Sequence, residues 1–598
     1  MQGIFAIFAP SIFFVVTMKI KTIIAACVAF VCGCGQEPDI TLQDKYHPNQ
    51  TLGAIPDSNL AARCYNGVFV GVESDGVVAF KGIPYSKPPV GELRWKAPER
   101  PDSSAAAVEA RYFGKAPVQT RANTILASFN DIGEDCLYLN VWKSAADTAA
   151  MKPVMVYIHG GSYGWGGSMD PLYNGANLVR RHPDVILATV GYRLGMMGFI
   201  DFSGVEGGDR YPDAPNLGLL DQVAALQWIK ENITAFGGDP GNITVFGESA
   251  GAGSVSILSV MPAAKGLFQK AICESGSIAL TYSKDECRPL TERLLQLTGA
   301  TNVAQLASLS EDEIISLNLH LNDYANFPQR DGRIVPADLY EAYRRGDASE
   351  ISMIMGTNSD ESRYWQHSYP GPKIFNMAIR VLLENDIADF DAADAQAVDD
   401  FLDETQCEDG WEVPEFYNEV MFRLPAIKQA EGQSNNGAAA YMYYWRYPSA
   451  IPHFGAAHLT ELSYVFGNLD VDIYTGSGNI DTLLSRRIQD IWVNFARSGV
   501  PADGNFTMPR YDTQARATTV FNSGNDIATA SKPLDSQRQR LDAALSYHLN
   551  GNTMSLSLNV PYVWKCGVIL VLTVGIIVAG AIYVRRRKRP AQTSTEFT

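Results

Sequence analysis

The chain has 598 residues, of which 46% are hydrophobic and 19% are charged. This composition can bury a large core and excludes an intrinsically disordered protein. The net charge of −17 makes the surface acidic, which opposes non-specific binding to nucleic acid and to anionic lipid. Length alone suggests several domains, although large α/β enzymes of this size also occur as one unit.

The first 35 residues have the character of an export signal. From Met18, the stretch MKIKTIIAACVAFVCGCG has a basic start, a short apolar core and small residues where a signal peptidase could cut. We therefore expect a cleaved signal peptide over residues 1–35. Upstream apolar residues leave open whether Met1 or Met18 starts the protein. Two alternatives also stay open: a bacterial lipoprotein box, VCGC, with Cys34 lipidated, and an uncleaved anchor or buried helix.

The middle of the chain alternates between apolar runs and helical periods. The runs VMVYIHGG, DVILATVGYR and ITVFG predict buried strands, and NLGLLDQVAALQWIKENITAFGG predicts an amphipathic helix that stops at two glycines. Alternating strands and helices predict a large, mostly parallel sheet with right-handed crossovers, that is, an α/β fold. Further on, ISMIMGTN and AAYMYYWRY predict strands, and IQDIWVNFARSG predicts a helix ending at Gly499.

Ser249 lies where the strand ITVFG meets the following helix, in the sequence GESAG. Gly247 and Gly251 fit a turn in which the chain segments approach too closely for side chains, and Glu248 precedes the serine. Such a turn presents the serine at the edge of the sheet, above a helix N-terminus that favours negative charge. A plain glycine-rich turn is the alternative, but the placement favours a nucleophile.

A serine nucleophile needs a base, a carboxylate that orients the base, and donors for the oxyanion. The sequence HGGS follows the first predicted strand and offers free backbone N–H groups. With the residue after the nucleophile, the candidate donors are Gly161, Ser162 and Ala250. His159 precedes the serine in the chain, so we interpret it as a structural residue of the turn and not as the base.

A second apolar run lies near the C-terminus, from Cys566 to Val584. Its 19 uncharged residues are about long enough to span a bilayer, and five basic residues, 585–589, follow it. A buried core helix is the alternative. We expect a type I cell-membrane protein with these parts: signal peptide 1–35, extracellular domain 36–550, juxtamembrane linker 551–565, transmembrane helix 566–584 and cytoplasmic tail 585–598.

The cysteines and sequons fit an exterior location. Five of the nine cysteines fall in the expected extracellular domain, which permits two disulfides and one spare thiol: Cys64, Cys136, Cys273, Cys287 and Cys407. Four N-x-[ST] sequons are compatible with glycosylation: Asn49, Asn232, Asn242 and Asn505.

Several stretches resemble the type-B carboxylesterases, the cholinesterase- and neuroligin-like branch of the α/β-hydrolases. They include FKGIPYSKPPVGELRWKAPE, EDCLYLNVW, PVMVYIHGGSY, GYRLGMMGF, the segment around GESAG and LFQKAICESGS. The resemblance runs from about Val68 to about Pro509, nearly the whole expected extracellular domain, and implies an α/β-hydrolase fold. It implies that Glu361 in GTNSDES is the acid and that His458 in AAHLTELSYVFG is the base. Asp360 is the alternative acid.

The resemblance further implies hydrolysis of a small carboxylic ester through an acyl-enzyme, with no metal or organic cofactor. In the family Cys136 pairs with an upstream cysteine that this chain lacks, so we expect Cys64–Cys136, with Cys273–Cys287 as a second disulfide and Cys407 free. The choline-binding Trp of cholinesterases is also missing, so choline specificity is not expected. A non-catalytic, neuroligin-like adhesion receptor is the alternative function, and a homodimer is left open.

Overall fold

The computed structural model describes residues 47–542, except 56, 120–131, 147–150, 277, 322–325, 367–382, 384–391, 406–411 and 479. The chain divides into two units, Met1–Lys45 and Tyr46–Thr598, and the described fold belongs to the second. The expected signal peptide, the linker, the apolar run at 566–584, the basic tail and Cys407 lie outside the described residues. Among the residues that are described, no helix has the length and apolar character needed to cross a bilayer.

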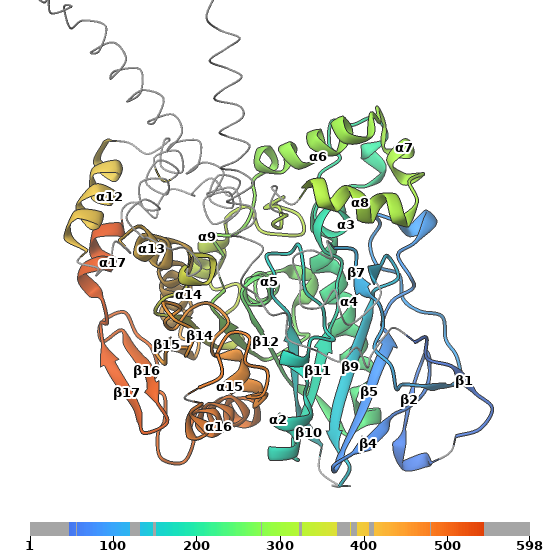
Figure 1. The fold of residues 1–598 in the computed structure, drawn as a ribbon, viewed down its shortest axis with the longest axis horizontal. Coiled ribbons are helices and arrows are strands. Elements are labelled where there is room, and N and C mark those ends of the chain that lie inside the picture. The colour runs from blue at the N-terminus through green and yellow to red at the C-terminus, as the bar shows by residue number, and fades with distance from the viewer. Residues whose placement is uncertain are drawn as a thin grey trace, which may run out of the picture. The chain divides into compact units, whose positions relative to one another are not determined.

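Eleven of the described strands form one sheet, which runs from β4 at one edge to β17 at the other (Figure 1). The neighbouring strands β11, β10, β12, β13, β14, β15 and β16 are parallel. At the two edges, β4, β5, β9 and β17 pair antiparallel. This confirms the large, mostly parallel sheet. In spatial order the strands are β4 (Val72–Ser74), β5 (Val77–Pro84), β9 (Tyr138–Ser144), β11 (Ile186–Val190), β10 (Lys152–Ile158), β12 (Gly238–Glu248), β13 (Lys270–Glu274), β14 (Ser352–Asn358), β15 (Ala440–Trp445), β16 (Ala517–Ser523) and β17 (Asp526–Ser531).

Helices cover both faces of this sheet, which is why its central strands are apolar without alternation. One face packs against α4 (Leu217–Asn232), α5 (Ala250–Leu258), α9 (Leu339–Arg345) and α14 (Leu424–Asn435). The other face packs against α2 (Ala176–Arg181), α15 (Leu462–Phe466) and α16 (Thr482–Ser498). The helix α16 ends at Gly499, which adopts a left-handed conformation with φ 78°, as its sequence predicted.

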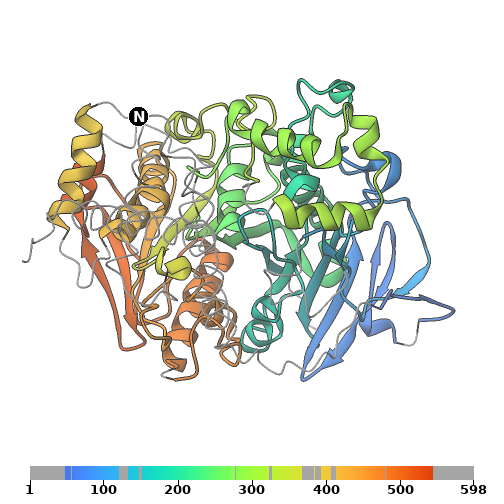
Figure 2. The same ribbon diagram turned by 45° about the horizontal axis from the view of Figure 1, so that its top comes forward.

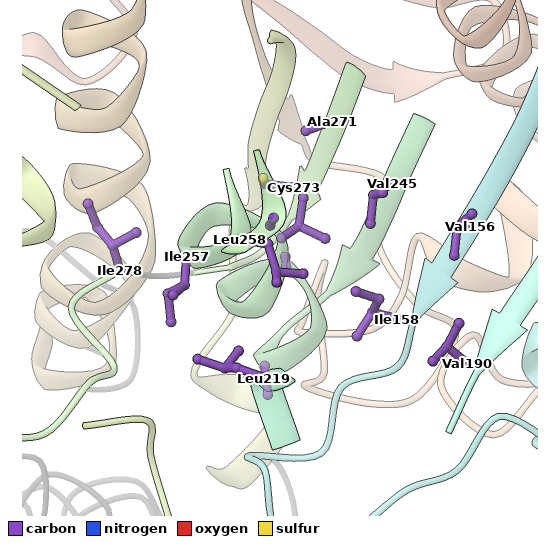
Figure 3. Close-up of a cluster of buried hydrophobic side chains, with 14 of the residues drawn as sticks. Val156, Ile158, Val190, Leu219, Val245, Ile257, Leu258, Ala271, Cys273 and Ile278 are labelled. Carbon is purple, nitrogen blue, oxygen red and sulfur yellow. The ribbon is translucent and has the colours of Figure 1, made fainter. Parts of the chain in front are cut away.

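The core between the sheet and α5 lies directly under the strand-to-helix turn of Ser249. Val156 and Ile158 of β10 and Val245 of β12 belong to the same buried cluster as Ile257 and Leu258 of α5 (Figure 3). All five side chains are buried. The packing therefore fixes the angle at which α5 leaves the sheet.

Smaller elements flank the sheet. A separate four-stranded sheet has the order β1-β6-β3-β2, and α6, α7 and α8 lie together in light green in Figures 1 and 2, sharing a third apolar cluster. The remaining bounds are β1 (Thr51–Leu52), β2 (Ala61–Cys64), β3 (Gly67–Val70), β6 (Ala107–Glu109), β7 (Ala116–Pro117), β8 (Ile132–Gly133), α3 (Gly195–Gly198), α6 (Lys284–Thr298), α7 (Val303–Ala307), α8 (Glu311–Leu321), α10 (Arg363–Gln366), α12 (Ala392–Glu404), α13 (Glu412–Tyr417), the π-helical turn η11 (Asn418–Arg423) and α17 (Asp535–Leu541).

Helix α4 differs from its sequence prediction as an amphipathic helix. It is buried over most of its surface, and only Gln227, Lys230 and Glu231 are exposed. The small sheet covers its outer side, where the indole N–H of Trp228 donates to Oδ1 of Asn66 over 3.0 Å. Tertiary packing thus buries a helix whose sequence periodicity alone indicated one solvated face.

Both predicted disulfides are wrong in this structure, where Cys64, Cys136, Cys273 and Cys287 are all free thiols. The residue after Cys64, Tyr65, donates its backbone N–H to the Asn232 side chain at the C-terminal end of α4. Cys136 instead lies beside the charges of Asp221 and Arg193 at the N-terminal end of that helix. Eleven residues of helix span about 16 Å, well beyond the reach of a disulfide.

The second pair is separated in a similar way. Cys273 on β13 accepts a hydrogen bond from the Ser256 hydroxyl of α5 at 3.3 Å. Cys287 on α6 lies beside Gln329 and Asp201. The two thiols therefore contact different neighbours. Burial also raises the pKa of the Cys273 thiol to about 12.

Candidate active site

Ser249 is the single residue between the end of β12 and the start of α5. Its φ of 56° and ψ of −126° are unusual for a residue other than glycine. Two backbone bonds hold this geometry: its N–H donates to the Glu274 carbonyl over 2.9 Å, and its carbonyl accepts from the Gly253 N–H over 2.8 Å. The side chain is half-buried. A strained serine at a strand-to-helix turn is the arrangement that the sequence predicted.

The two glycines around this turn have no room for a side chain. A Cβ atom on Gly247 would lie 2.6 Å from the Ile158 carbonyl oxygen, and one on Gly251 would overlap the same oxygen. The end of β10 therefore presses against the turn. The close approach inferred from the sequence is confirmed at both positions.

His458 and Glu361 form a buried pair although 97 residues separate them. Nδ1 of His458 lies 2.7 Å from Oε2 of Glu361, and both side chains are at most 2% exposed. The other carboxylate oxygen of Glu361 accepts the backbone N–H of Asn358 over 2.7 Å. Because a carboxylate can only accept, Nδ1 is the donor in this contact, and Nε2 is the ring nitrogen that faces away from Glu361.

The free Nε2 of His458 points toward the turn that carries Ser249. It lies 3.1 Å from Oε1 of Glu248, the residue before the serine, but the contact lacks hydrogen-bond alignment, and neither atom has another partner among the described residues. A buried ring nitrogen without a hydrogen-bond partner costs free energy. Such atoms are therefore rare in folded proteins, and a catalytic role is one explanation for them. Its position makes it available to a hydroxyl or to a bound substrate.

Asp360, the alternative acid, faces elsewhere. Its Oδ2 accepts the Ala456 N–H over 2.9 Å and the Ser359 hydroxyl over 2.8 Å, and its Oδ1 lies 3.0 Å from the Arg363 guanidinium. These bonds occupy the carboxylate in bracing a loop. Of the two neighbours, Glu361 makes the contact with His458.

Aromatic rings enclose the His458 imidazole. The Trp365 ring stacks on it with centroids 5.2 Å apart, the Phe422 ring lies at 5.1 Å, and the Tyr364 ring meets it edge-on at 5.9 Å. This packing restricts the rotation of the imidazole. It also keeps water from the Nδ1–Glu361 bond, which strengthens that bond.

Three further buried carboxyls, Glu248, Glu274 and Glu461, lie near this pair. Burial, with neighbouring carboxyls, raises the pKa of Glu248 and of Glu274 well above the usual range and that of Glu461 to about 8. Oε2 of Glu461 accepts the Asn358 side-chain N–H over 2.5 Å, and the Trp492 indole donates to Glu274 over 2.5 Å. The charged form is therefore disfavoured at all three positions.

The loop after β10 lies against the serine. A Cβ on Gly160 would be 2.9 Å from the Ser249 Cβ, and Gly161 and Ser162 follow with φ of 105° and 50°. Among the described residues, nothing accepts a hydrogen bond from the N–H of Gly161, Ser162 or Ala250. Free N–H groups beside a nucleophile can stabilise a developing oxyanion.

His159 stabilises the loop after β10, as the sequence indicated. Its ring stacks on Tyr192 at 4.5 Å, and the Tyr192 hydroxyl donates to the His159 carbonyl over 2.8 Å. Burial lowers the pKa of His159 to about 4, so the ring is neutral. It supports the loop and is not near the Glu361 pair.

Comparisons with known proteins agree with this geometry. Residues 64–540 match the model of the carboxylesterase family. The chain belongs to the carboxylesterase family. This carboxylesterase is 35% identical over 499 residues to the para-nitrobenzyl esterase of Bacillus subtilis, covering 79% of the chain and 97% of the relative. It is 30% identical to the fumonisin B1 esterase of Sphingopyxis macrogoltabida, covering 77% and 86%.

Solved structures show the same relationship. A carboxylesterase of Geobacillus stearothermophilus superposes with a TM-score of 0.73 at 32% identity, over 81% of this chain and all of that chain. The structure is therefore an α/β-hydrolase fold, and the protein is a carboxylic-ester hydrolase.

The sequence did not indicate every residue around the site. Trp365 follows Glu361 by four positions and Glu461 follows His458 by three, so proximity along the chain was a usable signal. Asn418 and Phe422 come from the π-helical turn η11 and had no signal of their own. A π-helical turn frequently marks a functional site, but it is recognised only in a structure.

Proposed function

We propose that this carboxylesterase acts through a triad of Ser249, His458 and Glu361 and forms an acyl-enzyme on Ser249. The supporting observation is the buried 2.7 Å contact between His458 Nδ1 and Glu361, with Nε2 open beside the residue that precedes Ser249. The strained backbone of Ser249 adds support, because a non-catalytic receptor on the same fold would have no use for it.

In the first half-reaction His458 Nε2 takes the Ser249 hydroxyl proton while Oγ attacks the ester carbonyl carbon. The carbonyl oxygen becomes an oxyanion beside the N–H groups of Gly161, Ser162 and Ala250. The tetrahedral intermediate collapses, the C–O bond to the alcohol breaks, and His458 gives the proton to the leaving oxygen. The carboxylate of Glu361 stabilises the imidazolium that forms.

In the second half-reaction water replaces the alcohol. His458 takes a proton from water, the hydroxide attacks the acyl carbon, and collapse releases the carboxylic acid and restores the Ser249 hydroxyl. The chain supplies the nucleophile, the base, the carboxylate and the oxyanion donors, and the reactants are the ester and water. The para-nitrobenzyl esterase and fumonisin B1 esterase relatives motivate small organic esters as substrates.

The test is hydrolysis of 4-nitrophenyl acetate by the wild type and by Ser249→Ala. We expect the variant to lose on the order of 10⁴-fold in kcat while keeping its circular dichroism spectrum and melting temperature. A folded Ser249→Ala protein with near-normal activity would overturn the triad.

We further propose that the enzyme is anchored at the cell surface by residues 566–584, with the active site outside. The support is the 19-residue apolar run and the five basic residues after it, which favour a cytoplasmic tail. Truncation before Trp564 should release active esterase into the medium. Activity that stays with membranes after truncation would point to the N-terminal segment, uncleaved or lipidated at Cys34.

A further inference from the structure

A single side-chain amide ties together both ends of the segment that carries Glu361. Asn418 is 5% exposed. Its Oδ1 accepts the Ser362 backbone N–H over 2.8 Å, and its Nδ2 donates to the Ser359 backbone carbonyl over 3.2 Å. Glu361 lies between the two bonded positions, so the amide closes a short loop around the acid.

The same π-helical turn also contacts the base. Asn418 begins η11, and Phe422, four residues later, packs its ring 5.1 Å from the His458 imidazole. Residues four apart lie near the same side of a helix. The turn thus presents one contact to the Glu361 segment and one to His458.

Backbone hydrogen bonds also hold the segment on both sides of Glu361. Upstream, the Ser359 N–H donates to the Trp445 carbonyl and the Asp360 N–H to the Ala456 carbonyl. Among the described residues, the acceptor for the Ser362 N–H is Asn418. Downstream, the Tyr364 N–H donates to the Glu361 carbonyl and the Trp365 N–H to the Ser362 carbonyl, each over 3.2 Å. Without Asn418, the buried Ser362 N–H loses its acceptor, so the turn that carries Glu361 can relax and move the carboxylate relative to His458.

We infer that Asn418 is a positioning residue that holds Glu361 in register with His458, and that η11 is therefore part of the catalytic support. The inference rests on the proposed triad. Asn418 touches neither the substrate nor the reacting atoms and acts only through the carboxylate. Displacing a positioned group by about 1 Å can cost on the order of 100-fold in rate, which sets the scale of the effect.

Several titratable groups bear on the readout, and Glu461 is a buried carboxyl that interacts with Glu361. Glu361 and Glu248 face the His458 ring from its two nitrogen sides, and Glu415, one turn before Asn418, hydrogen-bonds to the Asn418 side chain. A carboxylate held against Nδ1 favours the imidazolium. A looser Glu361 stabilises the imidazolium less, so we expect the acid limb of kcat/KM to move to lower pH.

The test compares Asn418→Ala with Gln429→Ala. Gln429 is a matched control because it is also a buried amide of the same helical run, but it bonds the Ser256 and Tyr343 hydroxyls and not the Glu361 segment. We expect Asn418→Ala to lose about 10- to 100-fold in kcat. KM should change by less than about threefold, and the acid limb should move to lower pH. Gln429→Ala should lower the melting temperature without moving that limb.

A double variant separates positioning from a general structural effect. In the Glu361→Gln background, Asn418→Ala should cost less than about threefold more, because the two residues act as a unit. If Asn418→Ala does not fold, Asn418→Ser, whose hydroxyl is too short for both bonds, carries the same test. Unchanged kcat in a folded variant, an effect on KM alone, or full additivity with Glu361→Gln would overturn the inference. Normal activity of Ser249→Ala would instead overturn the triad itself.

Discussion

The Nε2 atom of His458 lies 3.1 Å from Oε1 of Glu248, the residue directly before Ser249. The imidazole is thus held between two buried carboxyls, Glu361 at Nδ1 and Glu248 near Nε2. Only the Glu361 contact has hydrogen-bond geometry. Burial and nearby carboxyls raise the pKa of Glu248 well above its usual range, which disfavours its charged form beside the imidazole. Glu361, which contacts Nδ1 with hydrogen-bond geometry, is therefore the carboxylate placed to stabilise the imidazolium.

Glu248→Gln should be nearly silent at pH 7, because a glutamine imitates a protonated glutamic acid. The loss in kcat/KM should stay well below about 100-fold, the low end for removal of a working acid or base. Any divergence between wild type and variant should grow as the pH rises, because burial shifts the ionisation of Glu248 upward. Profiles of kcat/KM from pH 5 to pH 10 check this, and a loss above about 100-fold at pH 7 would mean that the Glu248 charge is used.

The variants Glu361→Gln and Asp360→Asn test which of two adjacent carboxylates serves the base. Glu361→Gln should lower kcat by on the order of 10²- to 10⁴-fold, because the imidazolium loses its counter-charge. Asp360→Asn should mainly lower the melting temperature, since Asp360 braces the Ala456 and Arg363 contacts. Steady-state kinetics together with thermal unfolding decide the case. The reverse pattern would assign the acid to Asp360.

Glu461→Gln should stabilise the protein increasingly as the pH rises. The pKa of Glu461 is raised to about 8 by burial and by Glu361, against 4.5 for the ordinary group. A raised carboxyl pKa contributes stability that is complete below the unfolded pKa of 4.5 and is lost as the pH rises through the folded pKa. The melting-temperature gain of Glu461→Gln should therefore grow by about 2 °C or more between pH 5 and pH 8.

The control for this effect is Glu73→Gln, because Glu73 is exposed on β4. Its melting temperature should follow that of the wild type at every pH. A Glu461→Gln difference that does not depend on pH would show that the carboxyl titrates normally.

Of the four sequons, Asn505 is the one we expect to accept a glycan in a secretory host that adds N-linked sugars. Asn49, Asn232 and Asn242 use their side-chain amides in hydrogen bonds, for example Asn232 to the Trp228 carbonyl over 2.8 Å. Asn505 and Thr507 are exposed. Glycopeptide mapping should find the sugar on Asn505, and Asn505→Gln should abolish it. A glycan on Asn232 would contradict the burial of that residue.

The parts of the fold that the sequence predicted are those with strong local patterns. The runs around β10, β11, β12, β14 and β15 are long, apolar and bounded by glycine or polar residues, so they were identified as strands. The strands at the edges of the sheet were harder to predict. The sequences of β16 and β17 mix apolar and polar residues, and the antiparallel order of β4, β5 and β9 depends on pairing between segments that are distant in the chain. Such pairing has no local signature.

In the active site, too, residues with a local sequence pattern were predicted, and residues that meet only in the fold were not. Ser249 was recognised from its own strand-to-helix context, whereas Glu361 and His458 required the family resemblance, because nothing local marks a carboxylate and an imidazole that meet across 97 residues. Asn418 and Phe422 escaped notice because their roles depend on a π-helical turn. The disulfides were mispredicted because a list of cysteines contains no distances, and helix α4 separates Cys64 from Cys136.

The most direct test of the account is covalent labelling of the nucleophile. The full-length protein is treated with a fluorophosphonate, which phosphonylates an activated serine, and the labelled peptide is identified by mass spectrometry. We predict one label per chain, on Ser249 within VFGESAGAG, with esterase activity falling in step with labelling and with little label on folded His458→Ala. A label on another serine that tracks the loss of activity, or full activity with Ser249 labelled, would contradict the proposed mechanism.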